Sequence, residues 1–176
     1  VITVQMNEPT LDDTMPDNER FTRALRAQTG VNVIRISYTA LNKLAFVLRK
    51  SQFEIQVVLR ETAKDLFVYD VFEKEKNVIV GGMAVDIGTT TVSAIIIDML
   101  TGEILAKGSA GNGQIRYGAD VINRIIESEK PGGREKLQKA VIDETINPLI
   151  DTMCRQAHLD HSQIYRLCIA SNTTMN

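Results

Sequence analysis

Residues 83–103 read MAVDIGTTTVSAIIIDMLTGE, and this stretch decides what the chain can be. An apolar strand ends at Asp86, a Gly-Thr-Thr-Thr turn follows, and a second apolar strand leads to a Thr-Gly turn. A carboxylate at the open end of a buried strand can hold hydrated magnesium, because Mg²⁺ keeps several waters and needs few protein oxygens. The pattern predicts a β-hairpin that binds phosphate and magnesium.

The turn supplies the groups that an anion needs. Gly88 allows a positive φ or a close approach to a ligand, while Thr89, Thr90 and Thr91 offer hydroxyls and successive N–H groups. The alternative is a polar hairpin whose threonines merely suit a turn and a strand start. Because an acid and two apolar strands flank the turn, we favour phosphate binding. We assign cofactor binding to these four residues, and catalysis and water-mediated magnesium binding to Asp86.

Residues 1–77 predict a small domain of mixed α+β type, and we find no catalytic constellation in it. Apolar periodicity and alternation indicate the order strand, helix, helix and two strands, the last two paired as a hairpin. The expected strands are at 1–6, 53–59 and 66–72 and the helices at 16–28 and 40–50, and residues 31–36 form a short β-branched run. The Lys/Glu run at 73–76 is typical of a solvated linker and marks the boundary.

Residues 78–176 predict a second domain in the order β-β-β-α-α-β, which begins with an antiparallel meander. The expected strands are at 80–86, 91–98, 103–110 and 164–170, and the helices at 119–127 and 134–158. We expect the last strand to be buried and Pro148 to kink or split the longer helix.

The shorter helix of this second domain has a strongly apolar pattern. Its expected buried face consists of Val121, Ile122, Ile125 and Ile126. Asp120 precedes it, where the helix dipole favours an acid, and this structural role is favoured over catalysis.

Several of these motifs together resemble a known family. DIGTTT, the strand after it and the Thr101-Gly102 turn resemble the first phosphate motif of the superfamily of actin, sugar kinases and heat-shock ATPases. Within that superfamily, the run at 85–125, from VDIGTTTV to GADVINRI, resembles the reductive activators of corrinoid proteins. ASNTTMN at 170–176 strengthens this narrower match.

The resemblance implies a multidomain protein with an N-terminal [2Fe-2S] ferredoxin-like domain, a linker, a middle domain and a C-terminal ATPase domain. Residues 1–77 would belong to the middle domain, and residues 78–176 would form the truncated first part of an actin-like (ribonuclease H-like) ATPase domain. Such activators return corrinoid cobalt from Co(II) to Co(I), with ATP turnover making the uphill electron transfer possible. The implied partners are the corrinoid protein of a methyltransferase system and a ferredoxin-type electron donor.

The implied cofactors are ATP, magnesium and a [2Fe-2S] cluster. The loop containing Asn112 would border the nucleotide cleft. Asn172 and Thr173 follow the last strand, where open sheets place ligand groups, although a helix cap explains them equally well. Sugar kinases usually carry an acidic base near that place, so Asn172 disfavours a kinase.

The cysteines and histidines give little support for a metal site in this chain. Cys154 falls in an expected helix and Cys168 in an expected buried strand, so we expect reduced core thiols. The four cysteine ligands of a [2Fe-2S] cluster are absent, which places any cluster upstream. His158 and His161 have a spacing that permits chelation, but histidines in a polar loop are more typically solvated.

Composition and length limit the classes of protein to which this chain can belong. With 176 residues and a net charge of −2, the chain gives nucleic-acid or membrane binding no electrostatic support. No apolar run reaches the length of a membrane span and no basic leader is present, so we expect a cytoplasmic protein. Because the chain does not start with Met, we expect a fragment of a longer protein.

Three functions remain in view. The first is a fragment of the corrinoid activator, which alone should be inactive and bind Mg-ATP weakly or not at all, because only one wall of the cleft is expected. The second is a small-molecule kinase acting on a sugar or carboxylate, and the third is a non-catalytic docking or regulatory fragment. The sequence leaves open whether ATP is hydrolysed or only bound, and whether the chain forms a homodimer.

Overall fold

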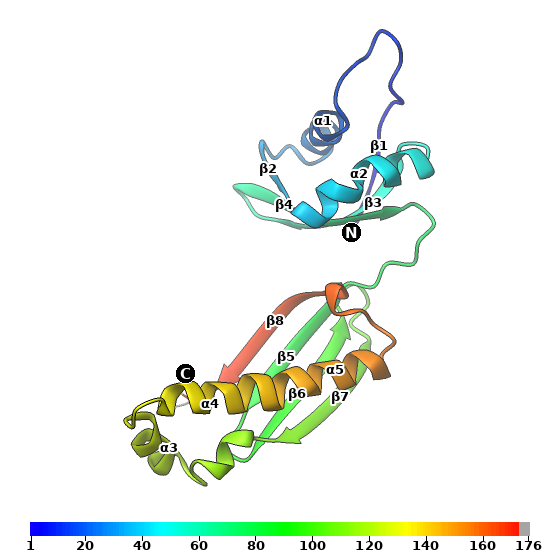
Figure 1. Cartoon of the computed structure of the whole chain (residues 1–176). Coiled ribbons are helices and arrows are strands. Elements are labelled where there is room, and N and C mark those ends of the chain that lie inside the picture. Colours follow the sequence, from blue (N-terminus) through cyan, green and yellow to red (C-terminus); the bar gives the residue numbers. More distant parts are fainter. Residues whose placement is uncertain (173–176) are drawn as a thin grey trace. The chain divides into compact units, whose positions relative to one another are not determined.

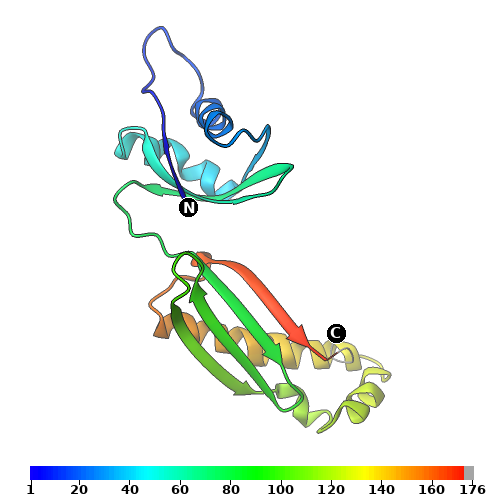
Figure 2. The same ribbon diagram turned by 180° about the vertical axis from the view of Figure 1, so that it is seen from behind.

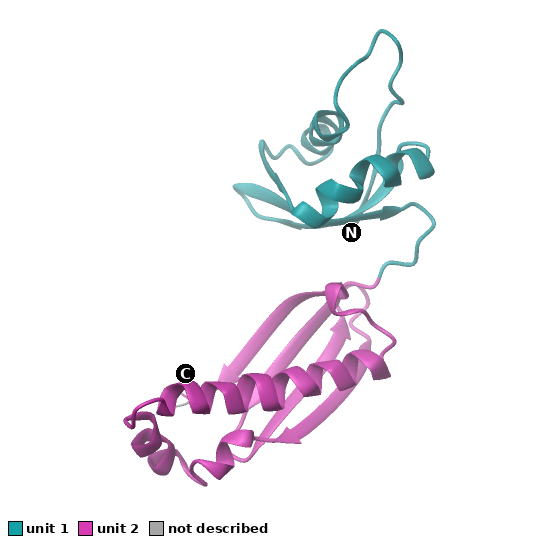
Figure 3. Cartoon of the chain, viewed as in Figure 1, with its two compact units in different colours: residues 1–78 teal, residues 79–176 magenta. Residues whose placement is uncertain are grey.

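The structure is a computed structural model that describes residues 1–172. The chain divides into two compact units, Val1–Val78 and Ile79–Asn176, which Figure 3 shows in separate colours. Each unit has its own four-stranded sheet and its own hydrophobic core. The expectation of a mixed α+β chain is therefore confirmed.

Unit 1 is a four-stranded sheet with two helices over one face (Figure 1). The strand order is β1-β3-β4-β2, in which β3 and β4 form the predicted antiparallel hairpin and β2 runs parallel to β4. The elements are β1 (Ile2–Gln5), α1 (Asp17–Thr29), β2 (Val33–Ile36), α2 (Tyr38–Lys50), β3 (Glu54–Glu61) and β4 (Asp65–Glu73).

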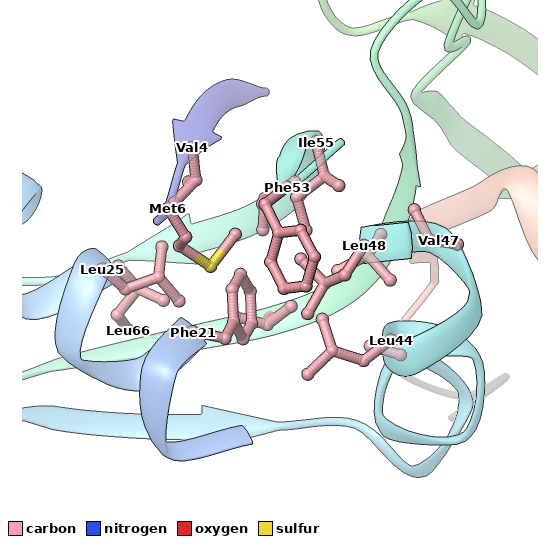
Figure 4. Packing of buried hydrophobic residues seen from close by; sticks show 14 residues of the cluster. Val4, Met6, Phe21, Leu25, Leu44, Val47, Leu48, Phe53, Ile55 and Leu66 are labelled. Carbon is pink, nitrogen blue, oxygen red and sulfur yellow. The ribbon is translucent and has the colours of Figure 1, made fainter. Parts of the chain in front are cut away.

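The core of unit 1 forms where the two helices meet the sheet (Figure 4). Phe21 and Leu25 of α1 are fully buried, and so is Leu48 of α2. Ser37 caps α2 because its side chain accepts a hydrogen bond from the amide of Ala40 at 3.0 Å. A satisfied first turn and an apolar inner face together keep α2 on the sheet.

We expect Leu48→Ala to lower the free energy of unfolding of unit 1 by about 2–5 kcal/mol, because truncation leaves a cavity in a close-packed core. The chain offers a matched control, since Leu41 on the same helix is 46% exposed. Urea unfolding followed by circular dichroism measures both variants. Equal losses from Leu48→Ala and Leu41→Ala would contradict the burial pattern.

Unit 2 begins with the predicted meander of three antiparallel strands and ends with a parallel strand beside the first of them. Its sheet order is β7-β6-β5-β8, and the predicted succession β-β-β-α-α-β is confirmed. The strands are β5 (Gly81–Ile87), β6 (Thr91–Asp98), β7 (Ile104–Gly111) and β8 (Ile164–Ser171). The helices are α3 (Val121–Ser128), α4 (Gly133–Val141) and α5 (Asn147–Gln156). Short helical turns lie at Gly113–Arg116 and His161–Gln163.

The interruption expected near Pro148 takes the form of a change in helix type. A π-helical turn, Ile142–Ile146, joins α4 to α5, and the two helices follow one another as a single rod (Figure 1). Pro148 lies in the first turn of α5. Because α5 continues directly from the π-helical turn, the missing amide of Pro148 removes one hydrogen bond from the rod at the point where the helix type changes.

The expectation that the last strand is buried is wrong. Leu167 and Ile169 of β8 are 46% and 54% exposed, because β8 lies at the edge of its sheet with β5 as its neighbour. Figure 2 shows the sheet face that none of the described helices covers. Cys168 is also exposed, so the expectation of core thiols holds for Cys154 alone.

The expected buried face of the helix after the meander is also wrong. Ile122, Ile125 and Ile126 of α3 are exposed, whereas Arg124 is 4% exposed. This inversion arises because the arginine makes several hydrogen bonds to the loops beneath the helix, and these bonds set its rotation.

Candidate phosphate-binding site

The predicted hairpin lies at one end of the sheet in unit 2. Asp86 on β5 is paired with Ser93 on β6 and with Ala170 on β8, so it lies on a central strand. The amide of Gly88 donates to the carbonyl of Thr91 at 3.0 Å and closes the turn. The structure thus brings the predicted acid, glycine and threonines together.

Position 88 needs glycine because another backbone atom lies close to it, and not because of an unusual φ. Its φ is not positive, in contrast to Gly102 in the next turn. A Cβ at position 88 would lie 2.6 Å from the carbonyl oxygen of Thr91, the atom that Gly88 itself binds. The sequence left two roles open for Gly88, a positive φ or a close approach to another group. The structure shows the close approach, and the approaching atom belongs to the turn itself.

Three successive carbonyls of the turn are held from one side by the protein. Asn112 contacts two of them, because its side-chain amide donates to Gly88 and its backbone amide donates to Thr90, both at 2.9 Å. The guanidinium of Arg124 donates to the carbonyl between them, that of Thr89. The orientation of each peptide plane in the turn is therefore fixed.

This orientation leaves backbone donors on the opposite side. In a trans peptide the N–H and C=O bonds point in opposite directions, and no peptide bond within residues 1–172 is cis. The amides of Thr89 and Thr90 thus point away from Asn112 and Arg124, and neither donates to the described residues. The Asp86 carboxylate is exposed and makes no hydrogen bond or ion pair with the described residues. Such an array suits an anion with an associated cation.

A buried polar network anchors Asn112. Its side-chain oxygen accepts a hydrogen bond from the amide of Gln114 at 3.0 Å, and the Gln114 side chain donates to the carbonyl of Leu137 on α4 at 3.0 Å. The neighbouring amide of Gly113 donates to the hydroxyl of Thr145 at 3.0 Å. Thr145 belongs to the π-helical turn, a feature often found at functional sites. The long helix thereby positions the phosphate turn.

Arg124 is the site residue that the sequence did not reveal. Its Nε donates to the carbonyl of Gly118 at 2.9 Å and its Nη1 to the side-chain oxygen of Gln114 at 3.1 Å. Burial lowers the pKa of Arg124, and the nearby charge of Asp120 raises it. The only signal in the sequence for a buried arginine was its position within a helix rich in isoleucine. Asp120 itself caps α3 by accepting from the amide of Asn123 at 2.8 Å, which confirms the structural role predicted for it.

Comparison with known proteins now identifies the family. Residues 1–77 match the family described as the RACo linker region, and residues 81–176 match the RACo middle region. The chain belongs to the RACo family of reductive activators. The resemblance to activators of corrinoid proteins is thereby confirmed. The family description calls residues 1–77 the linker region, whereas the sequence-based expectation called them the middle domain.

Two relatives of this RACo chain support the assignment. It is 38% identical over 104 residues to the corrinoid activation enzyme RamQ of Eubacterium limosum, a match that covers 58% of this chain and 17% of the relative. It also matches a solved structure titled reductive activator for corrinoid, iron-sulfur protein, with a TM-score of 0.79 and 34% identity. That match covers 99% of this chain and 28% of the solved chain. The RACo chain therefore spans less than a third of either relative.

Two further predicted site residues fall at the end of the RACo chain. Asn172 follows β8 directly, and β8 pairs with β5 through Ser171 and Ile87, the residue before the phosphate turn. Its role as a cofactor contact stays a prediction. Thr173 lies outside the described residues.

The histidines of the RACo chain belong to a surface segment. His161 contacts the carboxylate of Asp151 at 3.2 Å, and both side chains are at least half exposed. Within residues 1–172, no group of three or more His, Cys, Asp or Glu side chains is arranged to hold a metal ion. None of the helices in this range is long and apolar enough to span a membrane.

Proposed function

We propose that this chain is part of an ATP-dependent reductive activator that returns corrinoid cobalt from Co(II) to Co(I), and that unit 2 supplies one wall of its Mg-ATP site. The names of the two relatives support the reaction class. Because the chain spans only part of either relative, the activity of the whole protein, its corrinoid partner and its ferredoxin-type electron donor belong to the proposal.

The observation that carries this proposal is the orientation of the phosphate turn. With the carbonyls of Gly88, Thr89 and Thr90 held by Asn112 and Arg124, the amides of Thr89 and Thr90 remain available to a phosphate. These donors are preorganised, so binding an anion needs little rearrangement of the protein.

Magnesium and ATP fit the groups that the turn presents. When bound, Mg-ATP supplies a phosphoryl group whose transfer releases free energy. The protein's contribution to such chemistry is positioning and electrostatic stabilisation. The amides of Thr89 and Thr90 would hold phosphate oxygens, and the exposed Asp86 carboxylate would orient a water molecule on magnesium. We assign this turn to a partial actin-like ATPase domain.

A [2Fe-2S] cluster does not fit the residues of this chain. Such clusters need four protein ligands, usually thiolates. Of the two cysteines, Cys154 belongs to α5 and is buried in the core of unit 2, and Cys168 is exposed on the edge strand. We therefore assign no electron-transfer step to these residues and place the cluster of the proposed activator in another part of the protein.

Addition of a Co(II) corrinoid protein is expected to stimulate ATP hydrolysis by the full-length protein. A partner coupled to turnover must change the energy of the nucleotide-bound state, and the coupling works in both directions. Phosphate release is measured with and without the partner, and loss of Co(II) is followed optically under a low-potential electron donor.

The same assay discriminates the activator from a kinase. No phosphorylated small molecule is expected among the products. Stimulation by a sugar or carboxylate, with stoichiometric transfer of phosphate to it, would replace the activator with the small-molecule kinase. Binding of the corrinoid protein without any ATP hydrolysis would favour the docking or regulatory fragment.

A further inference from the structure

We propose that Arg124 is a positioning residue that orients and polarises the phosphate turn. This inference rests on the proposed function, because it concerns how the same turn holds the phosphates of Mg-ATP. Arg124 would act through the peptide between Thr89 and Thr90, on the side opposite the ligand.

The hydrogen bonds of Arg124 join three segments of unit 2. Arg124 donates to the carbonyl of Thr89 in the turn, to the carbonyl of Gly118 in the following loop and to the side chain of Gln114. A planar guanidinium presents its donors in a rigid fork, so these contacts tie the three segments at fixed mutual angles. The fork therefore fixes the peptide between Thr89 and Thr90, while Asn112 holds the peptides on either side of it.

Arg124 also carries a buried positive charge. Arg124 is 4% exposed, and desolvation lowers the pKa of its guanidinium, yet arginine stays protonated in proteins. Burying a cation costs more than burying a neutral amide, even though a neutral amide also donates to a carbonyl. The neutral side-chain amide of Asn112 makes such a hydrogen bond to the carbonyl of Gly88. The charge at the Thr89 carbonyl also makes a contribution that a neutral amide cannot make.

That contribution is polarisation of the donor that faces the ligand. The carbonyl of Thr89 and the amide of Thr90 belong to one peptide group, and hydrogen bonds in series strengthen one another. A cation at the carbonyl draws electron density from the peptide, so the N–H of Thr90 becomes a stronger donor toward phosphate. The buried charge also adds a favourable field for an anion on the turn.

The test compares variants of the full-length protein by calorimetric titration with Mg-ATP. Arg124→Gln is expected to raise the Kd for Mg-ATP about tenfold to a hundredfold, the usual worth of a charge-assisted hydrogen bond. Arg124→Lys keeps the charge but not the fork, so it is expected to recover only part of the lost affinity. If the Gln variant does not fold, Arg124→Met, which keeps the aliphatic stem, replaces it with the same expected loss.

Arg134→Gln is the matched control, because Arg134 is an exposed arginine on α4 and its loss changes the net charge equally. Its Kd is expected to equal that of the wild type. Thermal midpoints of all variants separate folding from binding.

Each outcome has a defined meaning. Wild-type affinity in Arg124→Gln would overturn the inference and leave the proposed function standing. Equal losses in the Lys and Gln variants would show that the charge of Arg124 does not polarise the turn and would also overturn the inference as stated. A wild-type protein that does not bind Mg-ATP would overturn the proposed function, and the inference with it.

Discussion

Asp86→Asn is expected to lower ATP turnover by the full-length protein about a hundredfold, the usual effect of removing one positioned electrostatic group. The substitution keeps the shape of the side chain and removes the charge that would orient hydrated magnesium. The thermal midpoint should stay close to that of the wild type, because the exposed Asp86 carboxylate makes no hydrogen bond or ion pair with the described residues.

Steady-state phosphate release and thermal unfolding measure these two effects. Glu103→Gln is the matched control, since Glu103 is an exposed carboxylate after the Thr-Gly turn, which joins β6 to β7 at the end of β6 opposite the phosphate turn. Turnover of this control should equal that of the wild type. Unchanged turnover in Asp86→Asn would mean that the acid only ends its strand.

Gly88→Ala is expected to weaken binding of Mg-ATP about tenfold to a hundredfold, as expected when hydrogen bonds to a charged ligand are misplaced. The added Cβ would lie 2.6 Å from the carbonyl oxygen of Thr91, a backbone atom that cannot rotate away. The turn must therefore shift, and the amides of Thr89 and Thr90 shift with it.

Gly111→Ala provides the control for this second prediction. Gly111 ends β7 beside the same turn, and a Cβ there would meet no atom within 4 Å. Calorimetric titration of both variants with Mg-ATP measures the two affinities. Equal affinities for the two variants would show that the turn tolerates a side chain at position 88.

The sequence alone determined those parts of the fold that depend on local pattern. Alternating apolar residues predict the hairpin of unit 1, because side chains of a strand alternate between its faces. Apolar runs joined by short Gly-containing turns predict the meander, and both elements are present. Asp120 is a recognisable helix cap for a similarly local reason, since its partner lies three residues away. The phosphate turn follows from residues that are adjacent in the chain.

Only the tertiary structure decided how that turn is oriented and which face of α3 is buried. Asn112 lies 24 residues from Gly88, and Arg124 lies 35 residues from Thr89. Hydrophobic periodicity predicts isoleucines inward on α3, but hydrogen bonds from a single arginine to distant carbonyls set the rotation of the helix instead. Periodicity records which side chains are apolar, whereas the partners of a buried polar group depend on segments that only folding brings together.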